Sequence, residues 1–396
     1  MSCGLAINGG KPVRSGMLPY GHQWIDGEDI KAVIEVLRSD WITQGPKVVE
    51  FEEEFARYVR TKYAVAVSSG TAALHSACFA ASITKGDEVI TTPITFVASA
   101  NCVLYQGGTP VFADIDKDTL NIDPKEIRKK ITPKTKAIIP VDFTGLPADL
   151  EKILQIAKEN NLIVIEDASH ALGATYKGSK IGSISDMTIF SFHPVKHITT
   201  GEGGMVTTNR REYYERLKLF RSHGITKNTD ANLSCPWYYE MRGLGYNYRI
   251  TDFQCALGLS QLKKIDKFIK CRKQIAYEYH NEFRIMPEIT VPIYYPGESD
   301  TTWHLYVIQL NLERLKVGRM EIFEALRAEN IGVNVHYIPV HLQPYYQKRF
   351  GYKFGDFPKA ENYYERAITL PIFPKMPDKD IDDVVAAVKK VVKYFK

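Results

Sequence analysis

The sequence predicts an α/β protein in which a largely parallel sheet is covered by helices on both faces, followed by a smaller α+β part. Short β-rich apolar runs alternate with helical runs between residues 63 and 208. The β-rich runs are apolar throughout, which is typical of parallel strands buried on both faces. After about residue 250 this alternation stops. We therefore predict a large α/β domain over residues 1–255 and a small C-terminal α+β domain over residues 256–396.

The elements of the large domain follow from local patterns. Residues 26–39 combine an acidic first turn with apolar residues at helical spacing, and residues 47–60 predict a second helix. The strands predicted after them are 63–67, 87–92, 109–115, 136–143, 162–167, 187–192 and 203–208, and the helices between them are 71–82, 95–106 and 149–161.

The C-terminal part has a different pattern. Residues 253–284 predict one long helix, and residues 291–300 a connection rich in proline and tyrosine. A strand at 304–312, a helix, a strand at 332–337 and a C-terminal amphipathic helix complete the prediction.

The composition excludes several classes of protein. The 396 residues carry a formal net charge of only +5, and no basic block with interleaved aromatics indicates nucleic-acid binding. Six scattered cysteines form no Cys-x-x-Cys pair, which favours a reducing compartment. Because the first residues have no apolar signal-peptide core and no apolar run is long enough to span a membrane, we expect a cytoplasmic protein without membrane contact.

Two polar segments occur at predicted strand ends. SSGTAAL (68–74) opens a helix, so its backbone N–H groups and hydroxyls could bind an anion; an ordinary helix cap is the alternative. EDASH (166–170) places two acids at the end of a buried strand, where they need a cationic partner. A helix cap or a metal carboxylate is the alternative for EDASH, but no further cluster has ligand spacing, and we predict no metal.

A third segment, SFHPVK (191–196), places Lys196 after a strand and before a glycine turn. A poorly solvated lysine loses its charge easily and becomes a nucleophile toward carbonyls. A surface lysine in a loop is the alternative. Ser191 could supply a hydroxyl to an anion.

A fourth segment, residues 243–258, carries Asn247 and Arg249 and could pack on a partner or be a structural loop.

An anion site, a carboxylate and a lysine at the strand ends of one domain are what pyridoxal phosphate requires. The anion site would hold the phosphate, the carboxylate would pair with the pyridine nitrogen, and the lysine would hold the aldehyde. The sequence therefore predicts a pyridoxal-phosphate enzyme.

The order of these motifs resembles the DegT/DnrJ/EryC1/StrS sugar aminotransferases. The motifs are SSGTAAL, TPITFVASAN (92–101), EDASHALGA (166–174), SFHPVK with the following ITTGEGG, and GYNYRITDFQCALG (245–258). The resemblance runs from about residue 20 to residue 374. It implies the aspartate-aminotransferase-like fold of type I pyridoxal-phosphate enzymes, with a mostly parallel seven-stranded sheet, and a homodimer with shared active sites.

The resemblance also implies roles for individual residues. Lys196 would bind the cofactor's aldehyde, Asp167 would pair with the pyridinium nitrogen, and His170 would support the cofactor. The residues implied to hold the phosphate or the ring are Thr71, Ala72, Phe96, Ser191 and, from the neighbouring subunit, Asn247. The residues implied on the substrate side are Tyr20, Trp41, Ile42, Thr43, Gln44, Arg249, His336, Tyr337, Ile338 and Pro339.

Within that family, ITQGPKV (42–48), SFHPVK and VNVHYIPVHLQPYY (333–346) look most like the pseudaminic-acid branch. This likeness implies transfer of an amino group from L-glutamate to C4 of a UDP-linked 4-keto-6-deoxy-N-acetylhexosamine. The product would be UDP-4-amino-4,6-dideoxy-N-acetyl-β-L-altrosamine. The same chemistry on a 4-amino-arabinose, bacillosamine-type or perosamine precursor remains open. One departure from the family is His197, where proline often follows the lysine.

Three other functions are weighed against this one. Tyr176 and Lys180 have the Tyr-x-x-x-Lys spacing of an NAD-dependent nucleotide-sugar dehydratase or epimerase, but no glycine-rich turn follows the first strand, and the segment reads better as a turn between strands. A dehydratase of related fold would replace Lys196 with histidine. A non-catalytic binding protein would have no chemical need for both Lys196 and Asp167.

Overall fold

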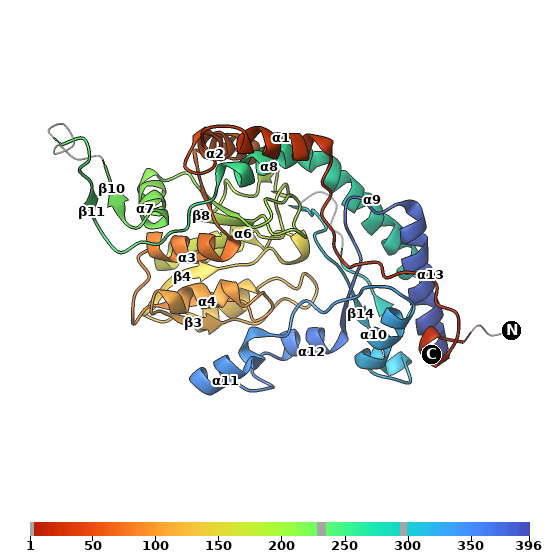
Figure 1. Ribbon diagram of the computed structural model, residues 1–396. Coiled ribbons are helices and arrows are strands. Elements are labelled where there is room, and N and C mark those ends of the chain that lie inside the picture. Colours follow the sequence, from red (N-terminus) through yellow and green to blue (C-terminus); the bar gives the residue numbers. More distant parts are fainter. Residues whose placement is uncertain (1–3, 228–234, 294–298) are drawn as a thin grey trace.

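The centre of the computed structural model is a seven-stranded sheet in the order β1-β9-β8-β5-β4-β2-β3 (Figure 1). The structure describes residues 4–227, 235–293 and 299–396. The strands are β1 (Tyr63–Val67), β2 (Glu88–Thr91), β3 (Thr109–Phe112), β4 (Thr135–Ile139), β5 (Ile163–Asp167), β8 (Met187–Ser191) and β9 (Gly204–Thr208). β9 is antiparallel to both of its neighbours, and the other pairs are parallel. The predicted mostly parallel sheet is confirmed.

Helices cover both faces of this sheet because successive strand residues point to opposite sides. Ala64 and Ala66 of β1 lie in one core and Val65 and Val67 in the other. The first core includes residues of α2 (Pro46–Val59), α5 (Pro124–Lys130), α6 (Leu150–Asn160) and α8 (Asp252–Leu262). The second includes residues of α3 (Gly70–Ala80), α4 (Ala98–Tyr105) and α7 (Arg211–Arg221). α1 (Gly27–Leu37) packs outside α8.

The sheet order determines where a ligand can bind. Because only β9 runs in the opposite direction, the carboxyl ends of β1, β2, β5 and β8 meet at one edge. The segments that follow these four strands carry the motifs singled out in the sequence. In open α/β sheets this edge is where ligands bind.

A second core lies in the C-terminal part of the chain. It is built on a small sheet of β12 (Ile289–Thr290), β14 (Tyr306–Leu310) and β15 (Ala367–Leu370), with α9 (Ile265–Phe283), α10 (Arg319–Ala328) and α13 (Asp378–Phe395). Leu5 and Leu18 from the start of the chain also belong to this core. α11 (Pro344–Phe350) and α12 (Pro358–Arg366) pack against the β3 side of the large sheet. The predicted boundary after residue 255 falls inside α8, and the division into two domains stays a prediction.

Two expectations about the C-terminal part are wrong. The predicted single helix over 253–284 is two helices, α8 and α9, because the chain turns at Lys264, whose ammonium binds Asp26 and Asp29 at 2.8 and 2.7 Å. The predicted strand over 332–337 is reduced to one bridge between Asn334 and Thr369, on the edge of β15 that does not pair with β14, because the backbone just before this bridge is hydrogen-bonded to Leu18 instead.

Smaller elements connect and extend the two parts. β6 (Thr175–Tyr176) and β7 (Ser179–Lys180) form a short hairpin, as expected for the segment around Tyr176, and β13 (Ser299–Asp300) pairs with β6. Residues 294–298 of the predicted connection lie outside the described residues. β10 (Ile225–Thr226) and β11 (Glu240–Met241) form an arm that projects away from the body of the molecule (Figure 1). Within the described ranges, no helix is long and apolar enough to cross a membrane.

The contact between α2 and α8 is close because Gly258 has no side chain. A Cβ at this position would lie 2.7 Å from Phe51 Cζ, and Phe51 is fixed by ring contacts with Phe55 and Phe192 at 6.0 and 5.3 Å between centroids. Phe51 is fully buried and cannot move aside without disturbing this cluster.

We expect Gly258→Ala to lower the free energy of unfolding by about 1–3 kcal/mol, because the overpacking outweighs the gain in helix propensity. Gly27→Ala in α1, where an added Cβ meets no atom within 4 Å, is the matched control and should change it by less than about 0.5 kcal/mol. Urea unfolding of the three proteins measures this. Equal stabilities of the two variants would contradict the close α2–α8 contact.

Candidate active site

A cavity of about 500 Å³ opens at the carboxyl edge of the large sheet. Its walls come from the ends of β1, β2, β5 and β8 and from two segments of the C-terminal part. Among the residues lining it are Tyr20, Ser69, Thr71, Phe96, Ser99, Asp167, His170, Ser191, Lys196, Glu202, His304, Asn334, His336 and Tyr337. The motifs at four strand ends therefore share one cavity.

Lys196 lies in the turn that follows β8. Its backbone N–H donates to the His193 carbonyl at 2.8 Å, and its amine Nζ lies 3.5 Å from His304 Nε2. Desolvation lowers the pKa of the amine from 10.5 to about 8, although the Asp167 carboxylate acts in the opposite direction. A substantial fraction of the amine is therefore neutral near physiological pH and able to attack a carbonyl.

Asp167, the last residue of β5, is 5% exposed. Its carboxylate accepts hydrogen bonds from Ser99 Oγ at 2.7 Å and from the Ser169 N–H at 3.1 Å, and Ser99 is in turn hydrogen-bonded to Thr95 at 2.7 Å. Both donors to Asp167 are uncharged. A buried carboxylate with uncharged donors is well suited to a cationic ligand group, which would remove much of the cost of its burial.

Two further carboxyls lie behind Asp167, on Asp142 and Glu166. Both side chains are fully buried; Asp142 Oδ1 accepts from the Ala148 N–H at 2.9 Å and Glu166 Oε2 from Thr188 Oγ1 at 2.9 Å. Their remaining oxygens have no donor among the described residues. Burial raises the pKa of both groups, and that of Asp142 is raised further by the nearby Glu166. A proton shared by the two carboxyls would satisfy both oxygens and would leave one negative charge, instead of two, behind Asp167.

His170 and two aromatic residues form the wall opposite Lys196. His170 Nε2 is hydrogen-bonded to the Tyr337 hydroxyl at 3.2 Å, and its buried Nδ1 has no partner within the described part of the chain. Burial keeps the pKa of His170 well below its usual value, so the ring is neutral. Phe96 is 59% exposed, with its ring 6.2 Å from that of Tyr337. An exposed aromatic ring that lines a cavity suits a flat ligand.

The start of α3 and the end of β8 form the anion side of the cavity. A Cβ on Gly70 would lie 3.0 Å from Ser191 Cβ, so glycine lets the two segments approach. Ser69 caps the helix by accepting the Ala72 N–H at 3.1 Å. Thr71 and Ser191 line the cavity, whereas Ala72 does not. Hydroxyls at a helix N-terminus are typical of phosphate binding.

The structure brings together about half of the residues expected in the site. Tyr20, Thr71, Phe96, Asp167, His170, Ser191, Lys196, His336 and Tyr337 line the cavity. The expected residues that do not line it within this chain are Trp41, Ile42, Thr43, Gln44, Ala72, Asn247, Arg249, Ile338 and Pro339. Trp41 and Ile42 are more than half exposed, and Asn247 is exposed beside its bridge partner Ser222.

Three residues near the cavity were not found from the sequence: Ser99, His304 and Arg272. Ser99 lies one turn of helix after Thr95 in a motif that was singled out, so its spacing was a usable signal. His304 begins a segment distant in sequence, and its ring lies 4.3 Å from that of His170. Arg272 is one of many cations on a long helix. Nothing local distinguishes the last two residues.

The fold and the cavity define a class of protein. A lysine after one strand, a buried aspartate at the end of the neighbouring strand and an anion site at a helix start are the groups that a pyridoxal-phosphate transaminase uses. The sequence model of the DegT/DnrJ/EryC1/StrS aminotransferase family matches residues 23–389. The chain belongs to this family, and the resemblance noted in the sequence is confirmed.

Individual relatives cover almost the whole chain. The chain is 50% identical to the protein MJ1066 of Methanocaldococcus jannaschii, over 96% of this chain and 99% of that protein. It is 48% identical to the spore coat polysaccharide biosynthesis protein SpsC of Bacillus subtilis, over 96% and 98%.

Solved structures agree with the fold. Helicobacter pylori PseC, an aminotransferase involved in the biosynthesis of pseudaminic acid, superposes with a TM-score of 0.89 at 35% identity, covering 96% of this chain and 100% of PseC. The sugar aminotransferase Spr1654 of Streptococcus pneumoniae superposes with TM-scores of 0.90 in its PMP form and 0.88 in its PLP form, at 33% identity; these comparisons cover 95% and 96% of this chain and 99% of Spr1654. The protein is a sugar aminotransferase, and pyridoxal phosphate is its cofactor.

The residues present fit that cofactor. Among the described residues, Asp167 has only uncharged donors and the Nδ1 atom of His170 lacks a partner, so Asp167 can receive the protonated ring nitrogen. The hydroxyls of Thr71 and Ser191 lie at a helix start. The ring would lie beside Phe96, within reach of the Lys196 amine.

A proton shared by Asp142 and Glu166 would make the stability of the protein depend on pH. A carboxyl whose pKa is raised on folding contributes stability at low pH that is lost as the pH rises toward that raised pKa. We expect the wild-type protein to lose stability relative to Asp142→Asn as the pH rises from 5 to 7, by up to about 1.4 kcal/mol per pH unit, because the amide donates to Glu166 without binding a proton. Asp142→Ala should lose about 2–4 kcal/mol. Urea unfolding at pH 5, 6 and 7 decides this, and parallel pH profiles for the wild type and Asp142→Asn would exclude the shared proton.

Proposed function

We propose that the protein transfers the amino group of L-glutamate to C4 of a UDP-linked 4-keto-6-deoxy-N-acetylhexosamine. The product would be UDP-4-amino-4,6-dideoxy-N-acetyl-β-L-altrosamine, a precursor of pseudaminic acid. The observation that carries the transaminase part is the common cavity of Lys196 and Asp167 at adjacent strand ends. Support for the sugar comes from the 35% identity to PseC over nearly the whole chain.

The residues of the cavity divide the chemistry among them. When bound, pyridoxal phosphate supplies an electron-accepting ring that stabilises negative charge at the donor's α-carbon. Asp167 would hold the proton on the ring nitrogen, and His170 and Phe96 would orient the ring. Lys196 Nζ, once displaced by the donor, would move the proton from the donor's α-carbon. In the second half-reaction the same amine would deliver a proton to C4 of the sugar.

The neutral state of Lys196 suits this role. A base must be unprotonated to accept a proton, and burial of the amine favours that form. His304 Nε2, at 3.5 Å, lies within reach to orient the amine between the two half-reactions. The histidine itself is kept neutral by burial.

The sugar would occupy the side of the cavity formed by the C-terminal part, where Tyr20, Asn334 and His336 lie. His336 Nδ1 is hydrogen-bonded to Thr369 at 2.9 Å and its carbonyl accepts from the Tyr363 hydroxyl at 2.6 Å, so this wall is held from behind. A different 4-keto nucleotide sugar is the second candidate. It is favoured by the 48% identity to SpsC, whose name assigns it to spore coat polysaccharide biosynthesis.

The first test is an absorbance spectrum of the purified protein with pyridoxal phosphate. We expect a visible band from the cofactor attached to Lys196, loss of the band with L-glutamate, and its return when the UDP-linked 4-keto sugar is added. Lys196→Ala should show no such cycle and at least a 10³-fold lower turnover. Lys180→Met, in the β6–β7 hairpin, is the control and should keep the cycle.

The outcomes separate the candidates. Bleaching by glutamate without recovery on this sugar would retain the transaminase and direct attention to the other 4-keto sugars. A wild-type rate in Lys196→Ala would overturn the assignment of the lysine. Loss of activity in Lys180→Met would instead favour the alternative function of an NAD-dependent dehydratase or epimerase that uses Tyr176 and Lys180.

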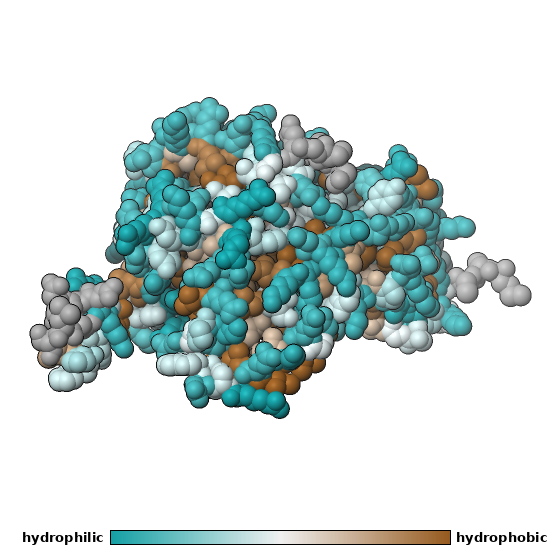
Figure 2. Space-filling view, turned by 90° about the horizontal axis from the view of Figure 1, so that it is seen from above, coloured by the Kyte–Doolittle hydropathy of each residue, from teal (hydrophilic) through white to brown (hydrophobic). Residues whose placement is uncertain are grey.

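We also propose that two chains share their active sites. Large apolar side chains are exposed on and near the β10–β11 arm, including Trp237 at 79% and Leu244 at 75%. Exposure of this size is typical of surfaces that a partner covers. In Figure 2 hydrophobic residues reach the surface where the arm joins the body. Asn247 follows this arm, is exposed and does not line the cavity of its own chain, which suits a residue that serves a partner's cavity.

Mixing two inactive variants tests this sharing. Lys196→Ala removes the lysine, and Asn247→Asp places a negative charge against the phosphate. If Asn247 serves the partner's cavity, a mixed dimer has one site with both wild-type residues, and remixing should restore up to about a quarter of the wild-type activity. If Asn247 serves its own chain, no mixed dimer contains an intact site and activity stays absent. Light scattering of the same samples gives the size of the assembly.

A further inference from the structure

Arg272 is a buried guanidinium on α9, only 1% exposed. Its Nη1 atom donates to the carbonyls of Ile372 at 3.0 Å, His304 at 3.1 Å and Trp303 at 3.4 Å. Its Nη2 atom donates to the Val195 carbonyl at 3.4 Å. Every hydrogen bond of this guanidinium within the described chain therefore goes to a neutral carbonyl.

A buried cation without a carboxylate partner is costly. Carbonyl dipoles compensate part of the lost hydration, but an apolar side chain of similar length would be less expensive to bury at this place. The cost appears in the guanidinium itself, since burial lowers the pKa of Arg272 to about 10. Packing alone does not account for a charge here.

The carbonyls that Arg272 binds belong to the neighbourhood of the reactive amine. Val195 directly precedes Lys196, and the His304 ring lies 3.5 Å from the Lys196 amine. Arg272 therefore connects the turn that carries the lysine to two segments of the C-terminal part. A guanidinium can do this because its donors point in several fixed directions in one plane.

We propose that Arg272 is a positioning residue that holds the Lys196 turn against His304 and uses its positive charge to favour the neutral form of the Lys196 amine. The consequence for catalysis rests on the role of Lys196 given under the proposed function. The effect of Arg272 on the protonation of the Lys196 amine does not depend on that proposed function.

The other titratable groups around Lys196 do not supply this charge. Asp167 is an anion and favours the charged amine. Burial lowers the pKa of each neighbouring histidine, which keeps these rings neutral at physiological pH: His170, His197, His304 and His336. Burial is the largest cause of the low pKa of Lys196, and among charged neighbours Arg272 acts in the same direction.

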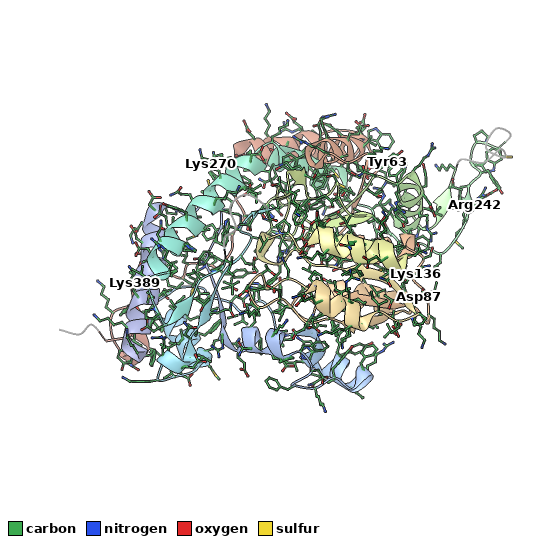
Figure 3. The ribbon with its side chains drawn as sticks, turned by 180° about the vertical axis from the view of Figure 1, so that it is seen from behind. Tyr63, Asp87, Lys136, Arg242, Lys270 and Lys389 are labelled. Atoms are coloured by element: carbon green, nitrogen blue, oxygen red, sulfur yellow. The ribbon has the colours of Figure 1, made fainter. Side chains whose placement is uncertain are left out.

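Competitive acetylation of the full chain without cofactor measures the amine directly. Trace acetic anhydride at pH 6 to 11, followed by peptide mass spectrometry, gives the fraction of reactive Lys196 against an exposed lysine. Lys270 lies two residues before Arg272 on α9 and points outward, away from the body of the protein (Figure 3), so it serves as the reference.

Removing the charge should raise the midpoint of Lys196 labelling. We expect a midpoint near 8 in the wild type and a rise of about one pH unit in Arg272→Met and Arg272→Gln, which is about a tenfold loss of Lys196 labelling at pH 7. Arg272→Lys should keep the midpoint within about half a unit because it keeps a charge. Lys270→Met, which removes an exposed cation from the same helix, should leave the midpoint unchanged. An unchanged pH midpoint of Lys196 labelling in Arg272→Met and Arg272→Gln would overturn the proposal that the charge of Arg272 favours the neutral amine.

A second readout tests positioning. In the holoenzyme at pH 9.5, above the labelling midpoint expected for the free amine, the rate of bleaching by L-glutamate should fall about tenfold or more in Arg272→Lys, which cannot reach all four carbonyls. A wild-type rate of bleaching in Arg272→Lys would overturn the positioning role. This test remains available if Arg272→Met and Arg272→Gln cannot be purified as folded proteins. Failure of the proposed function would instead appear as absence of the glutamate reaction in the wild type, with the labelling midpoints still measurable.

Discussion

The buried carboxylate of Asp167 is the charge around which the site is arranged. It ends a central strand of the sheet, and Ser99 and Ser169 donate hydrogen bonds to it. Behind it, burial raises the pKa of Asp142 and Glu166, which favours protonation of this pair and limits the negative charge next to Asp167. In front of it lies a cavity that can admit a cationic ring. Because Asp167 is nearly buried and its donors among the described residues are uncharged, its attraction for a cationic ring is stronger than that of a carboxylate in bulk water.

A buried cation also acts on Lys196. Arg272 approaches from α9, and this cation and the anion of Asp167 act on the protonation of the amine in opposite directions. The histidines of the cavity remain neutral and supply hydrogen bonds without charge. The two ends of this arrangement come from different cores of the molecule, which explains why the cavity lies between the large sheet and the C-terminal part.

The strand ends of the large sheet could be predicted because parallel α/β topology has a simple rule. The seven strands were recognised as short apolar runs, and their carboxyl ends must meet at one edge. Lys196, Asp167, Ser191 and Thr71 therefore came together as expected. The break between α8 and α9 could not be found locally, since neither glycine nor proline marks it. At this break Lys264 binds Asp26 and Asp29, more than 230 positions earlier in the chain, and such a contact forms only in the folded protein.

By itself the sequence determined the fold class, the family, the cofactor and the residues that follow each strand, because these depend on local periodicity and on motifs of fixed spacing. Tertiary structure alone decided which residues from distant segments complete the cavity. His304 reaches Lys196 and His170, and Arg272 reaches the Val195 carbonyl beside Lys196, only when the C-terminal part packs against the sheet. Their effect is electrostatic and geometric. It depends on burial and on distances of 3 to 4 Å, and neither quantity is encoded in the spacing of residues along the chain.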